Sequence, residues 1–231
     1  MITLRPASAR GRTQIGWLNS AHTFSFGQWH NPSAMGFRTL RVINDDRVTP
    51  KAGFPTHGHR DMEILSVVVE GELAHKDSMG NGSIIRPGEV QLMSAGTGVT
   101  HSEFNNTDGP LRFLQIWLPP AQRGLTPSYD QRAFPAEERA GRLRLMVSPD
   151  GAEGSVRIHQ DARIYGGHFE EDQSASYRIP PGRHAYVQVV RGRVQVAGKA
   201  MVEGDGLEVS GESGLGIEGV ESADILVFDL A

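Results

Sequence analysis

The sequence contains no cysteine. This absence excludes disulfide bonds, a thiolate nucleophile, and zinc or iron–sulfur sites that use cysteine ligands. Any metal ion bound by this chain must therefore be held by histidine, aspartate or glutamate side chains.

The sequence also lacks an excess of basic charge. Lys and Arg number 23 against 27 Asp and Glu, which gives a formal net charge of −4, and there is no basic run. Neither nucleic acid nor an anionic membrane is favoured as a partner. The opening residues MITLRPASARGRTQIGW lack the apolar segment of a signal peptide, and no window approaches the length of a transmembrane helix. We therefore expect a cytoplasmic protein that binds neither nucleic acid nor a membrane directly.

Helical patterns are scarce. The best helical candidate is PAEERAGRL, from Pro135 to Leu143, which starts with proline and has acidic residues in its first turn. Elsewhere, short runs rich in Val, Ile, Leu and Phe alternate with Gly, Pro and Asp or Asn turns, as in FRTLRVINDD, EVQLMSAGTG, LRFLQIWLPP and ADILVFDL. Strand-length runs at this spacing predict an all-β protein with antiparallel sandwich or barrel architecture.

The two halves of the chain echo each other. The hairpin pattern VVVEGELAH at Val67 is repeated as VVRGRVQVA at Val189, and RPGEVQLMSAGTG at Arg86 returns loosely as VEGDGLEVSGESG at Val202. Glycine-rich hairpins look alike in any all-β protein, but the paired echoes favour two β-barrels in tandem. We predict an N-terminal domain over residues 1–120, a linker over 121–142, and a C-terminal domain over 143–231.

Two short segments carry candidate metal ligands. In an extended strand, residues i and i+2 point to the same face. His57 and His59 of THGHRDMEI therefore present both imidazoles to one side of their strand. In the same way, His101 and Glu103 of GVTHSEFNN present their side chains to one side of theirs. One HxH pair is more often two solvent-facing histidines, but two strands of this kind side by side would bring four ligands together. Imidazole and carboxylate suit Fe(II), Mn, Co, Ni, Cu or Zn, and the lack of thiolates favours an open, reactive site over a structural one.

The remaining acidic and histidine candidates have less support. Glu63 would share a face with His59 if the strand stays regular. Isolated histidines are interpreted as surface or hydrogen-bonded structural residues; they are His22, His30, His75, His159 and His168. When Gly192 is matched to Gly71, the positions of His57 and His59 become Arg178 and Pro180, and no histidine follows His184. The C-terminal half therefore cannot build the same site.

Longer motifs carry a family resemblance. The segments HGHRDMEI, VVVEGELAHKDSMGN and IRPGEVQLMSAGTGVTHSE closely resemble the first cupin domain of the pirin family, and LNSAHTFSFGQW and GFRTLRVINDDRV look like its N-terminal signature. The resemblance covers nearly the whole chain and implies a bicupin of two antiparallel jelly-roll barrels. It implies one divalent transition metal, with Fe(II) favoured over Zn, Ni, Co, Mn or Cu. The implied ligands are His57, His59, His101 and Glu103, which leaves Glu63 a supporting or structural role.

The resemblance extends to bacterial pirins with quercetin 2,3-dioxygenase activity. It implies a metal-dependent dioxygenase that cleaves a flavonol with O2 and releases carbon monoxide and a depside. Glu103 would then be both a metal ligand and the catalytic base for the flavonol 3-hydroxyl. An apolar slot for the substrate could draw on aromatic residues of nearby segments, namely Phe24, Phe26, Trp29, Phe37 and Trp117.

Two alternatives stay open. Eukaryotic pirins also resemble this chain and act as transcriptional cofactors, so the first alternative is a non-catalytic, metal-dependent interaction protein with a protein partner. The second is a different metal-dependent activity, such as an isomerase or another dioxygenase on a small cyclic substrate, because cupins host many reactions on one site.

Overall fold

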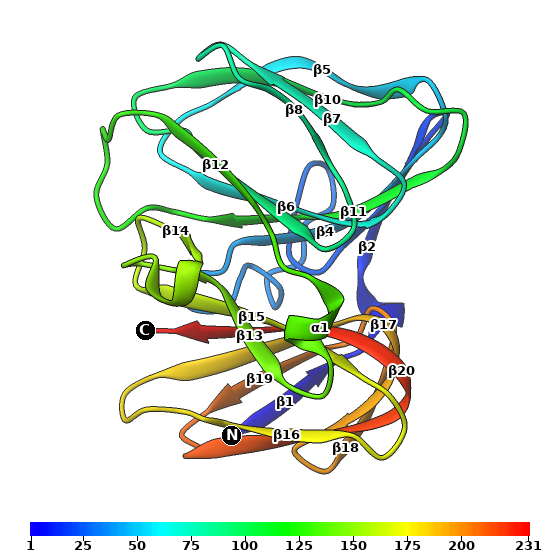
Figure 1. Ribbon diagram of the computed structural model, residues 1–231, viewed down its shortest axis with the longest axis vertical. Coiled ribbons are helices and arrows are strands. Elements are labelled where there is room, and N and C mark those ends of the chain that lie inside the picture. Colours follow the sequence, from blue (N-terminus) through cyan, green and yellow to red (C-terminus); the bar gives the residue numbers. More distant parts are fainter. The chain divides into compact units, whose positions relative to one another are not determined.

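The computed structural model describes every residue from Met1 to Ala231, and β-strands dominate it, as predicted (Figure 1). The predicted helix over Pro135 to Leu143 is shorter than expected, because α1 spans only Ala136–Arg139. Ala140 is extended and Gly141 adopts a φ of +64°, which ends the helix. No helix of the structure has the length and apolarity needed to cross a lipid bilayer.

The chain forms two compact units. The N-terminal unit contains Gly11–Ala133 and Val156–Gln160, and the C-terminal unit contains Met1–Arg10, Phe134–Ser155 and Asp161–Ala231. The predicted boundaries at 120 and 143 stay a prediction, and the compact units are divided differently. Residues 1–10, part of the predicted N-terminal domain, belong to the C-terminal unit. Residues 121–133, part of the predicted linker, belong to the N-terminal unit.

Two antiparallel sheets make up the N-terminal unit. Their strands are β2 (Gly11–Ile15), β3 (Leu18–His22), β4 (Val42–Val48), β5 (Ala52–His59), β6 (Glu63–Glu70), β7 (Leu73–Asp77), β8 (Gly82–Ile85), β9 (Glu89–Ser94), β10 (Val99–Asn105), β11 (Leu111–Leu118) and β12 (Ser128–Ala133). The short strand β14 (Val156–Arg157) also lies in this unit but belongs to neither of its two sheets. A four-stranded sheet has the order β5-β10-β7-β8, and a seven-stranded sheet has the order β12-β9-β6-β11-β4-β3-β2. Within this unit the two sheets lie face to face in Figure 1. Strand β12, inside the predicted linker, pairs with β9.

The interior of the N-terminal unit alternates between apolar and polar layers. Along β6, the same-face residues Ile64, Ser66 and Val68 are all buried. Ile64 belongs to an apolar cluster with Met93, Ala95 and Val99, whereas Val68 belongs to another cluster with Leu18, Val48, Leu73, Ile85, Leu111 and Phe113. Ser66 lies between the two clusters, so a polar layer crosses the apolar core.

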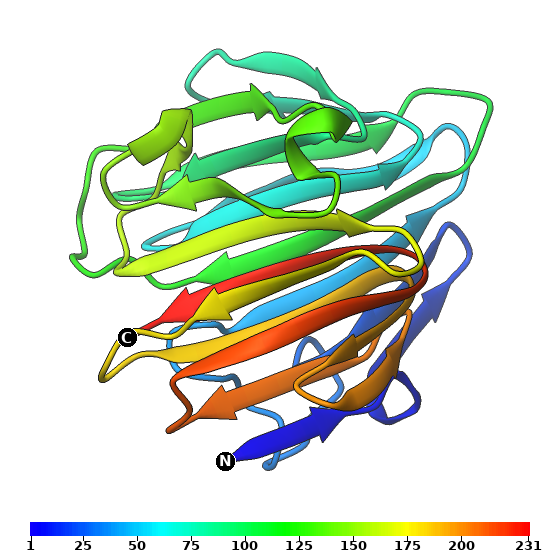
Figure 2. The ribbon, with the colours of Figure 1, turned by 60° about the horizontal axis from the view of Figure 1, so that its bottom comes forward.

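One continuous sheet makes up most of the C-terminal unit. Its strands are β1 (Ile2–Arg5), β13 (Leu143–Ser148), β15 (Ala162–Phe169), β16 (Ser174–Arg178), β17 (His184–Val196), β18 (Lys199–Val202), β19 (Gly206–Ser210) and β20 (Gly214–Leu230), with short 3-10 helices at Ala7–Ala9 and Ala152–Gly154. The order is β1-β19-β17-β20-β15-β13, with β16 beside β20 and β18 beside β17. Figure 2 shows the blue strand β1 at the edge of this sheet, beside β19.

The C-terminal unit has a continuous apolar core. Its largest cluster is built mainly from β17 and β20 and includes Val187, Val189, Ile225 and Val227. When Gly192 is matched to Gly71, Val187 occupies the position of Ser66. The polar layer of the N-terminal unit therefore has an apolar residue as its counterpart here.

Gly71 provides a test of the hairpin geometry. Its φ is +79°, and a Cβ at this position would lie 2.3 Å from the carbonyl oxygen of Pro110. Gly80 has a φ of +93° with no atom within 4 Å of a Cβ, so it is a matched control. Left-handed backbone costs about 1–2 kcal/mol per residue and overpacking about 1–3 kcal/mol more. We expect Gly71→Ala to lower the free energy of unfolding in urea clearly more than Gly80→Ala does, and equal losses would contradict this account.

Candidate metal centre

Strands β5 and β10 are antiparallel neighbours, and they bring the predicted histidines together. His101 lies opposite His57 in the ladder. Along β5, His57 and His59 are half-buried, whereas Gly58 between them is exposed. Both imidazoles of β5 therefore turn toward the interior of the unit, on the side where His101 is buried.

A β-bulge separates His101 from Glu103. The register shifts there, so that Glu103 pairs with Phe54 of β5. A Cβ on Gly53 would lie 2.2 Å from the carbonyl oxygen of Glu103, so only glycine allows the two strands to approach this closely. His101 and Glu103 are both buried, each with 1% of its surface exposed.

Three imidazole nitrogens converge in the resulting cluster. The Nε2 atom of His101 lies 3.1 Å from the Nε2 atoms of both His57 and His59. The Nδ1 atom of His57 lies 2.8 Å from the carbonyl oxygen of Pro55. Because a carbonyl only accepts, Nδ1 carries the proton and Nε2 keeps its lone pair for another partner. Nitrogen ligands at about 2.0–2.1 Å from one ion lie ~3 Å apart, so this spacing fits a shared metal.

The rings of His59 and His101 are uncharged near neutral pH. Burial lowers the pKa of His59 to about 4, with a further contribution from the charge of His57. Burial also lowers the pKa of His101 to about 3, and the charges of the neighbouring histidines add to the effect. These two rings therefore present lone pairs rather than positive charges, which is the state that binds a metal cation.

A second cluster shares His101 with the first. His75, His101 and Glu103 have ligand atoms within 4.8 Å of one another, as do His57, His59 and His101. His75 lies opposite Glu103 because β7 pairs with the other edge of β10. The interpretation of His75 as an isolated residue was therefore incomplete. It is hydrogen-bonded, with Nε2 3.1 Å from Oδ2 of Asp77, but it also belongs to the site.

Glu103 is held in place by two donors. Its Oε1 accepts a hydrogen bond from the Ser66 hydroxyl at 3.0 Å, and its Oε2 accepts one from the Gln115 amide at 2.7 Å. Burial raises the pKa of the Glu103 carboxyl above its usual range, while the Gln115 and Ser66 donors lower it. The side chain is thus oriented and more basic than an exposed glutamate.

Ser66 and Gln115 are members of a polar row that the sequence reasoning missed. Paired residues on six neighbouring strands of the seven-stranded sheet form it in the order His22, Asn44, Gln115, Ser66, Gln91 and Gln131. All are buried except Gln131, which is half-buried. The available signal was a single polar residue within each apolar run, such as the serine of EILSVVVE and the glutamine of LRFLQIWL.

Glu63 does not join the histidines. Strand β5 ends at His59, and Asp61 has a φ of +48°, so the strand is not regular up to Glu63. Glu63 starts β6 in the other sheet, where it is buried. Its carboxylate accepts hydrogen bonds from the Ser94 hydroxyl at 2.6 Å and from the backbone N–H of His159 at 3.1 Å. The condition for Glu63 to share a face with His59, a regular strand between them, is therefore not met.

The other histidines lie outside both clusters. His22, His168 and His184 are hydrogen-bonded, with His184 Nδ1 2.8 Å from the Ser210 hydroxyl, and His30 is exposed. The two groups of candidate metal ligands described above both lie in the N-terminal unit.

A cavity of 440 Å³ lies beside the cluster, within the N-terminal unit. Its volume falls in the range of about 300–1,000 Å³ that is usual for small-molecule sites. Phe26, Trp29 and Phe54 provide aromatic walls, and Gln115 lines the cavity while it contacts Glu103. Trp117 connects the two regions, because its ring lies 5.3 Å from that of Phe26 and 5.0 Å from that of His59. Three of the predicted aromatic residues, Phe24, Phe37 and Trp117, do not line the cavity.

Asp46 contributes a buried carboxyl group to the same cavity. Burial raises the pKa of Asp46 to about 7; the Ser20 hydroxyl opposes the shift, and the charges of Glu103 and Asp45 reinforce it.

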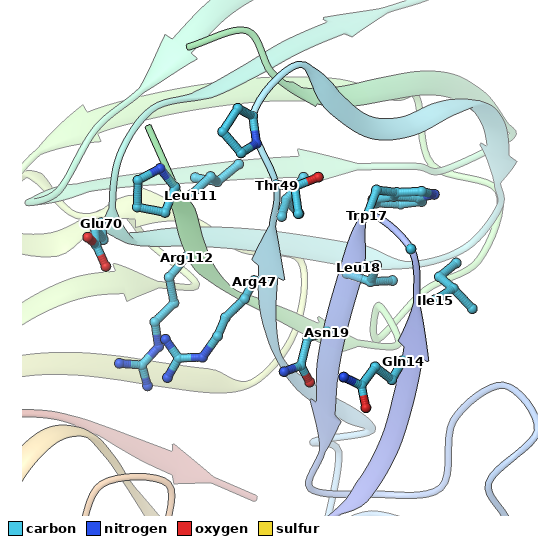
Figure 3. Close-up of a pocket in the computed structure, with 14 residues that line it drawn as sticks. Gln14, Ile15, Trp17, Leu18, Asn19, Arg47, Thr49, Glu70, Leu111 and Arg112 are labelled. Atoms are coloured by element: carbon cyan, nitrogen blue, oxygen red, sulfur yellow. The ribbon is translucent and has the colours of Figure 1, made fainter. Parts of the chain in front are cut away.

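A separate cavity of 280 Å³ in the same unit has different chemistry (Figure 3). Figure 3 shows the guanidinium groups of Arg47 and Arg112 close together at one side and Trp17 at the other. Arg112 forms a two-point ion pair with Asp45, with both distances 2.9 Å. No histidine lines this cavity, so it is distinct from the metal centre.

Comparisons with known proteins agree with this fold and this site. The family model Pirin matches residues 4–118, and the model for the quercetinase C-terminal cupin domain matches residues 145–230. A relative from Escherichia coli (strain K12) named quercetin 2,3-dioxygenase is 44% identical over 231 residues, covering 100% of this chain and 99% of the relative. A pirin-like protein from Caulobacter vibrioides is 35% identical over 233 residues, with 100% of both chains covered.

A solved structure gives the same result. The crystal structure of the bacterial pirin YhhW from Escherichia coli in complex with nickel(II) superposes with a TM-score of 0.95 at 42% identity, covering 100% of this chain and 99% of that chain. Fold and site thus define a bicupin, as predicted. The chain belongs to the pirin family, and the predicted family membership is confirmed.

The pKa of Asp46 predicts a dependence of stability on pH. The folded-state pKa of about 7 lies above the ordinary value of 3.8, so the unfolded chain releases this proton first and stability falls as pH rises between these values. One pKa unit corresponds to about 1.4 kcal/mol. In chelator-treated protein, Asp46→Asn should therefore gain about 2–3 kcal/mol over wild type between about pH 5 and pH 8 in urea unfolding.

Asp108→Asn is the control for this measurement, because the Asp108 side chain is 95% exposed. It gives the background expected of any change from Asp to Asn. A difference between Asp46→Asn and wild type that stays constant with pH would contradict the assignment of a raised pKa to Asp46.

Proposed function

We propose that this protein is a metal-dependent dioxygenase of the quercetin 2,3-dioxygenase type, which cleaves a flavonol with O2. The observation that carries the proposal is the convergence of three imidazoles near a buried carboxyl group, next to an aromatic-walled cavity. The name of the relative that is 44% identical over the full chain supports the same activity.

In this proposal, His57, His59, His101 and Glu103 hold one divalent transition metal. The nitrogen spacing of 3.1 Å and the neutral rings of His59 and His101 fit such an ion. Three imidazoles and a carboxylate accept several metals, and Fe(II) is the proposed one, although the related pirin structure contains nickel(II). When bound, the ion supplies Lewis-acid chemistry that makes a neighbouring hydroxyl group more acidic.

Glu103 performs the proton transfer in this proposal. Its raised pKa makes it a base for the flavonol 3-hydroxyl, and the Ser66 and Gln115 hydrogen bonds keep the carboxyl group oriented. The aromatic walls hold the planar ring system and exclude water. The overall reaction consumes one flavonol and one O2 and yields carbon monoxide and a depside, so it needs no further reductant.

The cavity favours an enzyme over a non-catalytic interaction protein. An interaction protein of the pirin type would use the same metal ligands, but it would not require a cavity of 440 Å³ with aromatic walls beside them. Measured flavonol turnover separates the two candidates, as the experiments below are designed to do.

The metal assignment predicts one ion per chain. The double change His57→Ala with His59→Ala removes two of the converging nitrogens and should abolish tight binding in elemental analysis of chelator-stripped, reconstituted protein. His184→Ala is the control, since His184 bonds Ser210 away from the cluster, and it should leave the stoichiometry unchanged. Two tight ions per wild-type chain, or none, would show that the ligand set is wrong.

The base assignment predicts a large effect of Glu103→Gln. The change keeps the size and one ligating oxygen but removes the charge, so metal should stay bound, more weakly, while flavonol turnover falls ~10²–10⁴-fold. Glu63→Gln is the matched control, because a glutamine can still accept from the His159 N–H and donate to Ser94. If metal-loaded Glu103→Gln turns over quercetin at the wild-type rate, Glu103 is not the base. If wild type shows no turnover with any metal, the interaction-protein alternative is the better one.

A further inference from the structure

Asp46 on β4 lines the 440 Å³ cavity, and one oxygen of its side chain has no hydrogen-bond partner. The residue is 3% exposed, and its Oδ1 atom is buried and makes no hydrogen bond. No other residue that lines this cavity has a buried side-chain oxygen or nitrogen in that condition. Unpartnered buried polar atoms are rare in folded proteins, and at a functional site they indicate a group that is kept for a ligand.

The preceding residue, Asp45, is a buried acid with a structural partner, and it provides a comparison for Asp46. Asp45 is also buried, but both of its oxygens accept hydrogen bonds from Arg112 at 2.9 Å. Successive residues of a strand point to opposite faces, so Asp45 and Asp46 serve different surroundings. Asp46 has no basic partner on its face, where a structural acid would need one.

The cavity around Asp46 already satisfies its other buried polar groups. His22 lies 2.8 Å from Thr13 Oγ1 through Nε2 and 2.8 Å from Asn44 Oδ1 through Nδ1. Gln115 donates to Glu103. The aromatic rings of Phe26, Trp29 and Phe54 form the apolar part of the wall, so a planar ligand can occupy the space between them and the polar groups.

Two residues of the cavity wall adjoin the metal centre. Gln115 contacts Glu103, and the ring of Phe54 lies 6.4 Å from that of His57. A ligand in this cavity can therefore lie with one end against Gln115 and Phe54, next to the cluster, and another end at Asp46.

We propose that the carboxylate of Asp46 accepts a hydrogen bond from a ring hydroxyl group of a polyphenolic ligand that lies between the aromatic walls. This inference rests on the proposed function and makes Asp46 a specificity-determining residue of that site. A phenolic hydroxyl is a good donor, and hydrogen bonds to an ionised acceptor are stronger than those between neutral groups. A ligand without the ring hydroxyl leaves the buried oxygen unpaired, so the site discriminates against it.

Anaerobic binding measurements test the inference separately from catalysis. Metal-reconstituted protein is titrated above pH 7, with oxygen excluded, with quercetin and with 3-hydroxyflavone, which keeps the 3-hydroxyl but lacks the hydroxyls on the other rings. Quenching of tryptophan fluorescence reports binding, because Trp29 lines the cavity. The variants are Asp46→Asn, Asp46→Ala and the exposed control Asp108→Asn, with thermal unfolding as the check on folding.

We expect Asp46→Asn to weaken quercetin binding about tenfold and Asp46→Ala at least as much, while the affinity for 3-hydroxyflavone changes less than about twofold. Parallel losses for both flavonols, or no loss for either, would overturn the inference. Aerobic turnover of quercetin by wild type is measured alongside. Turnover with no selective loss in the variants overturns the inference and leaves the proposed function standing. A selective loss without turnover supports the inference and removes the proposed activity, and a wild-type protein that binds neither flavonol overturns both.

Discussion

Burial of the Glu103 carboxyl group inside an apolar barrel is the constraint on which the rest of the N-terminal unit depends. A buried ionisable group is tolerated only when its oxygens have donors, and Ser66 and Gln115 supply them. These donors come from two adjacent strands, β6 and β11, whose register puts them side by side. A slip of one residue would turn both donors to the opposite face, so the polar layer and the strand register stabilise each other.

The same constraint explains the difference between the two units. Where the N-terminal unit has Ser66 between two apolar clusters, the C-terminal unit has Val187 within one continuous cluster. An apolar layer needs no donors and gains the full free energy of burial, on the order of 25 cal/mol per Å². The C-terminal unit is thus built for stability, whereas the N-terminal unit keeps a polar layer that serves the metal centre.

Two neighbouring aspartates on strand β4 differ in a similar way. Asp45 is neutralised by Arg112, whereas Asp46 is buried without a basic partner, and burial raises the pKa of Asp46 to about 7. Local features that oppose stability are expected at functional sites, where the surrounding structure compensates for them. The bulge between His101 and Glu103, which only Gly53 permits, is another such feature.

The sequence alone was sufficient for the all-β class, for the family, and for the two same-face pairs, because alternation along a strand is a local property. It did not reveal that His75 adjoins Glu103, that Ser66 and Gln115 hold that carboxyl group, or that Asp46 lines the cavity. It made the face of Glu63 conditional on a regular strand, and the positive φ of Asp61 that interrupts this strand was not visible in the pattern. Each of these facts depends on which distant strands become neighbours and in what register. Packing of the whole sheet decides those contacts, and no periodicity within one strand records them.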